Sequence, residues 1–309
     1  MKKIAVILPA YNEEKTIAEV IKGFHQELPD AEIIVVNNNS RDKTASLAEN
    51  SIQSIGANGK VITEPRQGKG NAVRCAFHAV EADIYVMSDA DLTYPAEQVK
   101  ELISIIERGE ADMVVGDRLS GGDYGEENKR NFHQLGNNMV RVLVNSLFKA
   151  NLKDIMSGYR AFNRRFVKNY PIMVEGFQIE TDMTLHALDK KFVVKEIPVR
   201  YVDRPEGSVS KLNTFSDGAR VLFTIFQILR YYRPMLFFGS VSAFFAFLTM
   251  IAGYPVITDW FQHKYIYHIP MAILASGLGL ISVMSFSLGL VLDSITHQYR
   301  MKYEHDQLR

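Results

Sequence analysis

Two long runs without a formal charge dominate the C-terminal part of the chain and limit what it can fold into. They cover residues 234–257 and 269–292, and each is longer than the roughly 20 residues that a helix needs to cross a bilayer. Trp260, Tyr265 and Tyr267 lie in the short segment between the runs, and such aromatic residues suit a membrane–water interface. Two runs of this kind joined by an aromatic loop are rarely the core of a soluble protein. The pattern predicts a transmembrane hairpin.

Basic residues on both sides of the hairpin predict its orientation, because positively charged segments stay in the cytoplasm. The loop between the runs holds one lysine, whereas several basic residues flank the pair: Arg220, Arg230, Arg233, Arg300, Lys302 and Arg309. We therefore expect an integral protein of the cytoplasmic membrane with both termini in the cytoplasm. Two helices are too few to form a transport path, so moving a product across the bilayer would require a separate flippase. A homo-oligomer is a further candidate assembly.

The overall charge excludes some classes of partner. The chain has 35 Lys and Arg against 35 Asp and Glu, so no net charge favours nucleic acid, and any electrostatic site must be local. The single cysteine, Cys75, excludes an internal disulfide and fits a reducing compartment. The apolar run that begins at Ile4 is too short for a signal peptide and has no cleavage site, so we expect a first strand there.

Residues 1–212 alternate short apolar runs with segments of helical spacing. The runs read KIAVILP, AEIIVVN, KVITE, ADIYVMSD and ADMVVGD, as expected for strands buried on both faces of a mainly parallel sheet. The pattern predicts a cytoplasmic α/β domain, Rossmann-like and flanked by helices. Residues 213–233 are predicted to form an amphipathic helix at the membrane interface, and 234–309 the hairpin with a short tail. The amphipathic segment NNMVRVLVNSLFKANL fits a core helix and an interface helix equally well.

Two aspartates follow the fourth run, in the sequence YVMSDADLTYP. Asp89 and Asp91 are separated by one residue, so in an extended segment both carboxylates face the same side. A hard divalent cation such as Mg²⁺ or Mn²⁺ would relieve their repulsion and also bind substrate phosphates. The alternative is that Asp91 only caps the helix expected near Pro95. Polar clusters also follow the other runs, and ligands of such sheets bind at the strand ends, which favours the metal.

Several motifs occur in an order that resembles a known family. They read LPAYNEE, VVNNNSRDKT, QGKGNAVR, SDADLTYP, GDR, SGYRAF and YVDRPEGSVSKL. Together they resemble family 2 inverting glycosyltransferases of the GT-A fold, and most nearly the dolichol-phosphate mannose synthase-like enzymes that act on polyprenyl phosphates. The resemblance covers roughly residues 1–233. It implies a nucleotide-sugar donor, a polyprenyl phosphate acceptor such as undecaprenyl or dolichyl phosphate, and a GT-A catalytic domain.

The resemblance also implies roles for individual residues at the donor. Asp89 would face the nucleotide, Asp91 would hold the Mg²⁺ or Mn²⁺ that bridges the diphosphate, and both are candidate metal ligands. Asn38 replaces the usual aspartate that contacts the base, which leaves UDP and GDP open. The nucleotide-sugar-binding set expected from these motifs is Pro9, Tyr11, Asn12, Glu13, Asn38, Lys69, Asp89, Ala90, Arg204 and Lys211.

The acceptor end has its own candidates. A lipid phosphate carries its own charge near neutrality, so it needs cations to position it more than it needs a base. Arg118 and Arg130 are the expected cations, whereas Lys129 fits an ordinary charged loop equally well, and Arg160 fits a phosphate ligand or a structural ion pair. Glu180 and Asp182 open a predicted helix as sugar or acceptor contacts, or favour its dipole. The expected catalytic set is Asp89, Asp91, Arg118, Arg130, Glu180 and Asp182.

Two other functions remain open on the sequence. A hydroxyl lipid such as diacylglycerol could replace the phosphate acceptor, and this reaction would need Glu180 or Asp182 as a base. A membrane-tethered nucleotide-sugar-binding protein without activity would fit the unusual Asn37-Asn38-Asn39 segment. The aspartate pair, together with Arg204 and Lys211, favours the enzyme. We therefore expect an inverting hexosyltransferase at the cytoplasmic membrane face.

Overall fold

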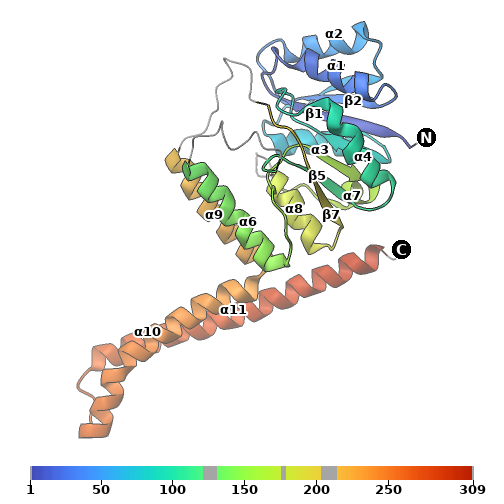
Figure 1. Cartoon of the computed structure of the whole chain (residues 1–309). Helices are drawn as coiled ribbons and strands as arrows, with labels where there is room; N and C mark the ends of the chain where they lie inside the picture. The colour runs from blue at the N-terminus through green and yellow to red at the C-terminus, as the bar shows by residue number, and fades with distance from the viewer. Residues whose placement is uncertain (1, 121–130, 175–178, 203–213, 308–309) are drawn as a thin grey trace. The chain divides into compact units, whose positions relative to one another are not determined.

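The computed structural model describes residues 2–120, 131–174, 179–202 and 214–307. The chain divides into two compact units, Met1–Thr214 and Phe215–Arg309, which are described separately below. The first unit is an α/β domain and the second consists of long helices (Figure 1). The predicted cytoplasmic location of the domain and the interface role of residues 213–233 stay predictions.

The first unit is built on a seven-stranded sheet in the order β3-β2-β1-β4-β6-β5-β7. Strands β1, β2, β3 and β4 pair in parallel, as do β5 and β7, whereas β6 runs antiparallel between β4 and β5. The five predicted strands are confirmed, and the sequence patterns missed β6 and β7. The strands are β1 Ile4–Ala10, β2 Glu32–Asn37, β3 Gly59–Thr63, β4 Ile84–Met87, β5 Met113–Asp117, β6 Arg160–Asn163 and β7 Val194–Pro198.

Helices cover both faces of this sheet, because its central strands are apolar on both sides. On β1, Val6 and Leu8 belong to the main core cluster, and the alternate residues Ala5 and Ile7 are equally buried. The helices of this unit are α1 Ile17–Glu27, α2 Thr44–Ser54, α3 Lys69–Ala79, the 3₁₀ turn η1 Ala96–Gln98, α4 Val99–Glu107, α6 Asn131–Phe148, α7 Arg164–Asn169 and α8 Ile179–Asp189.

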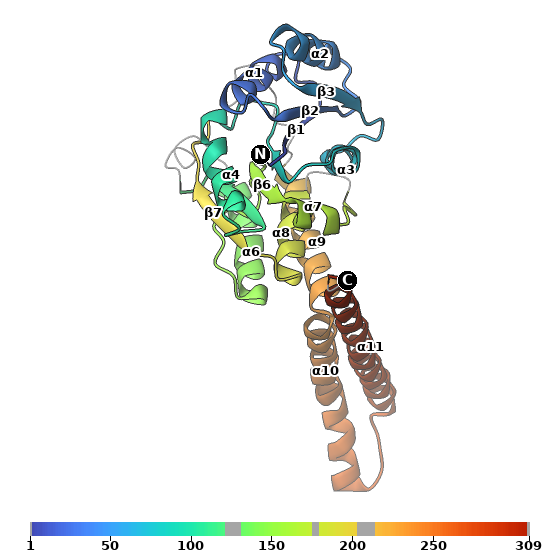
Figure 2. The same cartoon turned by 90° about the vertical axis from the view of Figure 1, so that its right-hand side faces the viewer.

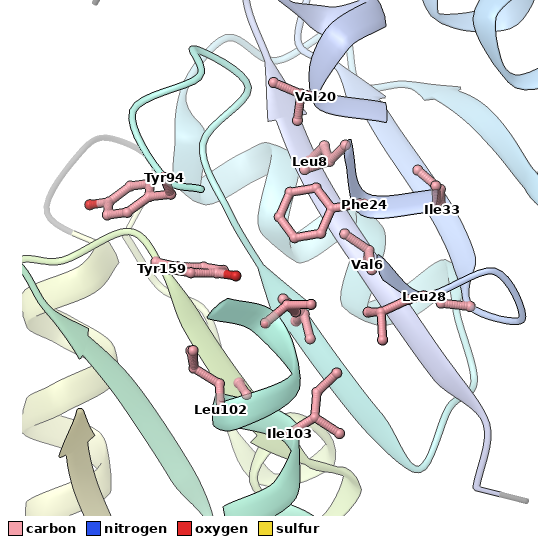
Figure 3. Packing of buried hydrophobic residues seen from close by; sticks show 14 of the residues in the cluster. Val6, Leu8, Val20, Phe24, Leu28, Ile33, Tyr94, Leu102, Ile103 and Tyr159 are labelled. Carbon is pink, nitrogen blue, oxygen red and sulfur yellow. The ribbon is translucent and has the colours of Figure 1, made fainter. Parts of the chain in front are cut away.

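The main core lies between β1, α1 and α4 (Figure 3). Phe24 of α1 packs edge-on against Tyr159, with ring centroids 6.3 Å apart. Leu102 and Ile103 of α4 complete this layer. Tyr159 lies next to the start of β6, so the core also fixes the segment that leads into this strand. This packed core fixes the positions of the strands whose polar ends form the site.

Helix α6 answers one of the questions left open by the sequence. Val140 and Val144, one turn apart, are buried, whereas Met139 and Val142 are exposed. The helix contacts α8 of the same unit. One face of α6 is therefore part of the domain core.

The second unit contains α9 Thr214–Tyr232, α10 Pro234–His263 and α11 Ile269–Gln307. Helices α10 and α11 lie side by side as a hairpin (Figure 2). Ser242 and Ser282 hydrogen-bond across the pair at 3.1 Å. At the turn, Asp259 accepts hydrogen bonds from the backbone N–H groups of Tyr267 and His268 at 2.8 and 3.0 Å. The hairpin thus contains polar contacts both across the helix pair and at its turn.

Both helices of the hairpin are long and apolar enough to cross a membrane. They have 30 and 39 residues, more than the roughly 20 that span a bilayer. Their large apolar side chains point outward: Ile273, Leu280 and Met284 are each at least 66% exposed. Soluble proteins rarely expose so much apolar surface to water, and such a surface marks a contact with a membrane or with a partner protein. The helices therefore match the predicted transmembrane hairpin.

Candidate functional site

Loops from three neighbouring strands meet at one edge of the sheet, where the sequence placed its polar clusters. In the parallel register, Ala10 at the end of β1 lies opposite Asn37 at the end of β2. The backbone N–H of Asn12 donates to the Ser40 hydroxyl at 3.1 Å, and the Thr16 hydroxyl donates to the Ala90 carbonyl at 2.7 Å. The loops after β1, β2 and β4 therefore form one cross-bonded edge.

Three of the six described non-glycine residues with positive φ lie at this edge. Asn12, Asn39 and Leu92 have φ values of 56°, 60° and 64°, in the left-handed region that asparagine tolerates but that is unfavourable for leucine. Strain of this type persists where surrounding contacts fix the conformation, and it is often found at functional sites. Leu92 lies directly after Asp91, so its conformation sets the direction in which the chain continues after the aspartate pair.

The two aspartates after β4 have different surroundings. Asp91 is buried and accepts hydrogen bonds from the backbone N–H and the hydroxyl of Thr93, at 3.2 and 2.5 Å. The Asp89 carboxylate is partly exposed and forms an ion pair with the Lys69 ammonium. The turn thus orients Asp91 from its own backbone, whereas Asp89 is held by a residue from another element.

Lys69 is the most constrained cation of the site. It is the first residue of α3, and its side chain is only 9% exposed. Its ammonium contacts the Asp89 carboxylate and, at 2.5 Å, a carboxylate oxygen of Glu180 on α8. Burial lowers the pKa of Lys69, but the two carboxylates outweigh it and hold this pKa above its ordinary value. Lys69 is therefore a charged link between the end of β4 and α8.

Glu180 and Asp182 lie on different sides of α8, because residues two apart on a helix do not share a face. Glu180 joins Lys69, as described above. Asp182 accepts a hydrogen bond from the Tyr170 hydroxyl at 2.6 Å, and its burial raises the pKa of its carboxyl group above the ordinary value. The structure therefore brings Glu180 to Asp89 and separates Asp182 from this cluster.

Arg118 and Asp154 form a second ion pair near the strand ends. Nε and Nη2 of Arg118 donate to the two carboxylate oxygens of Asp154 at 2.7 and 2.9 Å, and the guanidinium lies 5.6 Å from the Tyr201 ring centroid. Burial raises the pKa of Asp154, but Arg118 outweighs it and holds that pKa below its ordinary value. Any acceptor phosphate bound by Arg118 would share it with this carboxylate.

Arg160 has a structural role. It is fully buried, and its guanidinium donates to the carbonyl oxygens of Ser157 and Ile155 at 2.8 Å each and to the Thr184 hydroxyl at 3.0 Å. These bonds hold the segment before β6 against α8. Its burial leaves no access for a phosphate, and the contacts that the structure describes for it include no carboxylate. Of the two roles left open by the sequence, the phosphate ligand is therefore wrong; the role is structural, with Glu180 and Asp154 as nearby opposite charges.

Gly158 in this segment lies directly against the charged cluster. Its backbone N–H donates to the Tyr94 hydroxyl at 3.0 Å. A Cβ atom at this position would lie 2.6 Å from Oδ2 of Asp89 and 3.0 Å from Nζ of Lys69. Real side chains do not tolerate such distances. Only glycine therefore leaves Asp89 and Lys69 where they are.

Asn38 has a structural role that an aspartate could not fill. It is buried, and its amide NH₂ donates to the carbonyl oxygens of Arg66 and Glu64 at 2.8 and 3.4 Å, while its amide oxygen accepts from the backbone N–H of Gly68 at 2.7 Å. A carboxylate could not donate these bonds. Asn38 therefore holds the loop that leads to Lys69, and its predicted contact with a base stays a prediction.

The remaining predicted residues fall into two groups. Pro9, Tyr11 and Glu13 are partly exposed at the end of β1, and the backbone N–H of Glu13 donates to the Thr44 hydroxyl at 2.8 Å. Ala90 is buried between the two aspartates. The predicted cations Arg130, Arg204 and Lys211 lie outside the described residues.

The donor set fits a divalent cation of the Mg²⁺ type. The part of the chain that the structure describes contains no group of three or more His, Cys, Asp or Glu residues that could hold a metal ion. Mg²⁺, however, is usually bound by one or two carboxylates together with substrate phosphates. Asp89, Asp91 and Glu180 carry three negative charges against one positive charge from Lys69, so the cluster retains two negative charges. An aspartate pair with this charge suits a metal that arrives with a diphosphate.

Replacing Asn38 by aspartate tests the account of the loop. Asn38→Asp removes two donated hydrogen bonds and places a carboxylate against the two carbonyl oxygens that accepted them, so we expect a loss of about 1–3 kcal/mol in stability. Asn37→Asp is the matched control, because the Asn37 side chain accepts a hydrogen bond from the backbone N–H of Ser40, which aspartate can also accept. Thermal unfolding of both variants measures the difference. Equal destabilisation would contradict the structural role of the Asn38 amide.

Comparison with known proteins places the chain in a family. The profile of Glycosyl transferase family 2 matches residues 5–170. Glycosyltransferase AglJ of Haloferax volcanii is 29% identical over 283 residues, covering 90% of this chain and 90% of that protein. A dolichyl-phosphate hexose transferase of the same organism is 27% identical over 225 residues, covering 73% and 93%. An uncharacterized protein of Shigella flexneri is 41% identical over 142 residues, covering 46% and 87%.

Solved structures agree with the fold. Glucosyl-3-phosphoglycerate synthase from Mycobacterium tuberculosis, crystallised with Mn²⁺ and UDP-glucose, superposes with a TM-score of 0.58 at 22% identity, covering 74% of this chain and 78% of that chain. Another structure of that enzyme contains Mg²⁺ and UDP. At this identity the likeness concerns the fold, and it confirms the expected GT-A domain. Because the family profile spans more than half of the chain, the protein belongs to Glycosyl transferase family 2.

Proposed function

We propose that the protein is a membrane-bound inverting glycosyltransferase that moves a hexose from a UDP- or GDP-linked donor to a polyprenyl phosphate at the cytoplasmic face. Its membership of Glycosyl transferase family 2 supports the transfer of a sugar, and the relative named dolichyl-phosphate hexose transferase supports the class of acceptor. The two apolar helices α10 and α11 support a membrane location. Undecaprenyl and dolichyl phosphate both present a phosphate monoester on a polyprenyl chain, so the proposal covers either acceptor.

Both candidate bases already have partners within the protein, and this observation favours a phosphate acceptor over a hydroxyl acceptor. Glu180 is buried and ion-paired with Lys69, and Asp182 is hydrogen-bonded to Tyr170. A hydroxyl acceptor needs a base within reach of its proton. A lipid phosphate does not, because a phosphate monoester has a second pKa of about 6 and is largely ionised at neutral pH. Its oxygen can attack the anomeric carbon directly, with inversion.

At the donor end, Asp91 and Asp89 would hold a Mg²⁺ or Mn²⁺ ion. When bound, such an ion offsets the charge that develops on the departing nucleoside diphosphate. Pro9, Tyr11, Asn12 and Glu13 would border the nucleotide from the end of β1. The predicted contacts of Arg204 and Lys211 with the diphosphate, and of Arg130 with the acceptor, complete the proposed site.

The helix that precedes the hairpin would bring the acceptor to the site. Phe223, Phe226 and Tyr231 of α9 are exposed, and the guanidinium of Arg230 lies 5.3 Å from the ring centroid of Tyr231. Aromatic residues together with arginine suit the headgroup region of a bilayer. This composition supports an interface role for residues 213–233. A separate flippase would then carry the glycolipid across.

Transfer to lipid tests the proposal directly. Purified protein in detergent, with Mg²⁺ or Mn²⁺, is offered radiolabelled UDP- and GDP-hexoses and undecaprenyl phosphate, and label entering the organic phase is counted. We expect metal-dependent label in an acid-labile lipid with one donor. Asp91→Ala should lower the rate by at least about 100-fold, as loss of preorganised charge stabilisation typically does. The exposed Asp30→Ala serves as the control. Nucleotide binding without transfer would support a protein without activity.

Replacing Asp182 separates the two classes of acceptor. With a phosphate acceptor, Asp182→Asn should retain most of the activity, because the side chain can still meet Tyr170. If Asp182 were the base for a hydroxyl acceptor, the rate would fall by about 10²–10⁴-fold. Initial rates of the variant with undecaprenyl phosphate and with diacylglycerol measure this. A large loss, or transfer to diacylglycerol alone, would contradict the phosphate acceptor.

A further inference from the structure

The inference concerns Lys69, whose side chain is nearly buried between two carboxylates at the strand ends. Its ammonium is shared by Asp89, after β4, and Glu180, on α8. These partners are 20 and 111 positions away in the sequence, so Lys69 joins three elements of the fold: α3, the end of β4, and α8. At 9% exposure, little of its side chain is left to contact a substrate.

The backbone of Lys69 is fixed as firmly as its ammonium. Gly68, the residue before it, has φ and ψ of 132° and 135°, and its N–H donates to the Asn38 amide oxygen at 2.7 Å. Asn38 therefore sets the start of α3 from the end of β2. The two carboxylates then set the other end of the side chain. The Lys69 side chain is therefore held in place both at its backbone and at its ammonium group.

Removing the ammonium would change the position of Asp89 for an electrostatic reason. Asp89 and Glu180 both approach the same nitrogen, so their carboxylates lie close together and repel each other without it. Gly158 leaves no space on one side of Asp89, because a Cβ there would lie 2.6 Å from Oδ2. The repelled carboxylate would therefore turn away from its present orientation.

We propose that Lys69 is a positioning residue for glycosyl transfer, which sets the Asp89 carboxylate for the donor diphosphate and its metal by tying it to Glu180. This inference rests on the proposed function, in which the site binds a nucleotide-sugar donor together with a divalent metal ion. It gives Lys69 and Glu180 one shared role, in place of separate contacts with donor and acceptor. A compact ammonium suits this role, because a guanidinium would need more room than Gly158 leaves.

The shared role predicts non-additive effects. Lys69→Met leaves two carboxylates facing each other, whereas Lys69→Met combined with Glu180→Gln removes the repulsion. In the full-length protein in detergent, we expect Lys69→Met to lower the transfer rate at least about 100-fold, as expected when preorganised charges are displaced. The double variant should recover part of this loss. Lys60→Met is the matched control, since Lys60 pairs with Glu32 on the surface.

Binding of Mn²⁺ together with UDP or GDP, followed by electron paramagnetic resonance, supplies a readout that does not depend on turnover. Lys69→Met should weaken Mn²⁺ binding in the presence of the nucleotide at least tenfold, and the double variant should restore part of it. Unchanged Mn²⁺ binding in Lys69→Met, or effects of Lys69 and Glu180 that simply add, would overturn the inference and favour a direct substrate contact by Lys69.

Gly158→Ala provides a second variant if Lys69→Met does not fold. It keeps both charges but forces Asp89 or Lys69 to move, so it should produce the same loss of Mn²⁺ binding. Gly277→Ala, at a glycine with open space around it, is the control. Normal Mn²⁺ binding in Gly158→Ala would count against the inference. Absence of lipid transfer by the wild-type protein would instead refute the proposed function, and the Mn²⁺ measurement would still decide the role of Lys69.

Discussion

The buried ion cluster of Lys69, Asp89 and Glu180 is the interaction on which the site depends. A buried charge is costly unless it is paired, and here one ammonium pairs with two carboxylates from different elements. Loss of Lys69 would leave two carboxylates facing each other without compensation, and losses of this kind are large. The cluster therefore fixes the geometry between the end of β4 and α8. It also leaves a net negative charge, which a divalent cation bound together with the donor diphosphate would complement.

The segment from Asp154 to Arg160 packs against this cluster and helps to fix its position. Asp154 holds Arg118, the carbonyls of Ile155 and Ser157 bind the buried guanidinium of Arg160, and Gly158 lies against Asp89. Arg160 also reaches α8 through Thr184. The same short segment thus determines the position of a candidate acceptor residue, of the aspartate pair and of Glu180. The overall charge of the chain is zero, with 35 basic and 35 acidic residues. The charges of the site are therefore a local arrangement.

The sequence predicted the parts of the fold that depend on local pattern. Continuous apolar runs identified β1 to β5, and uncharged runs identified α10 and α11. The sequence patterns missed β6 and β7, because β6 has four residues and begins with a buried arginine, and β7 contains two consecutive charged residues, Lys195 and Glu196. The aspartate pair was visible from its spacing. The link from Lys69 to Glu180 was not, because it joins residues 111 positions apart through the tertiary fold. The separation of Glu180 from Asp182, by contrast, follows from helical geometry alone.

The configuration at the anomeric carbon of the product is the most direct test of the central claim, which is attack by a phosphate oxygen of the lipid on the donor sugar. Nuclear magnetic resonance of the purified glycolipid, formed from an α-linked donor, reports both the linkage and its configuration. The account predicts a β-linked sugar joined through its anomeric oxygen to the lipid phosphorus. An α-linked product, or a sugar attached to a hydroxyl oxygen, would contradict it.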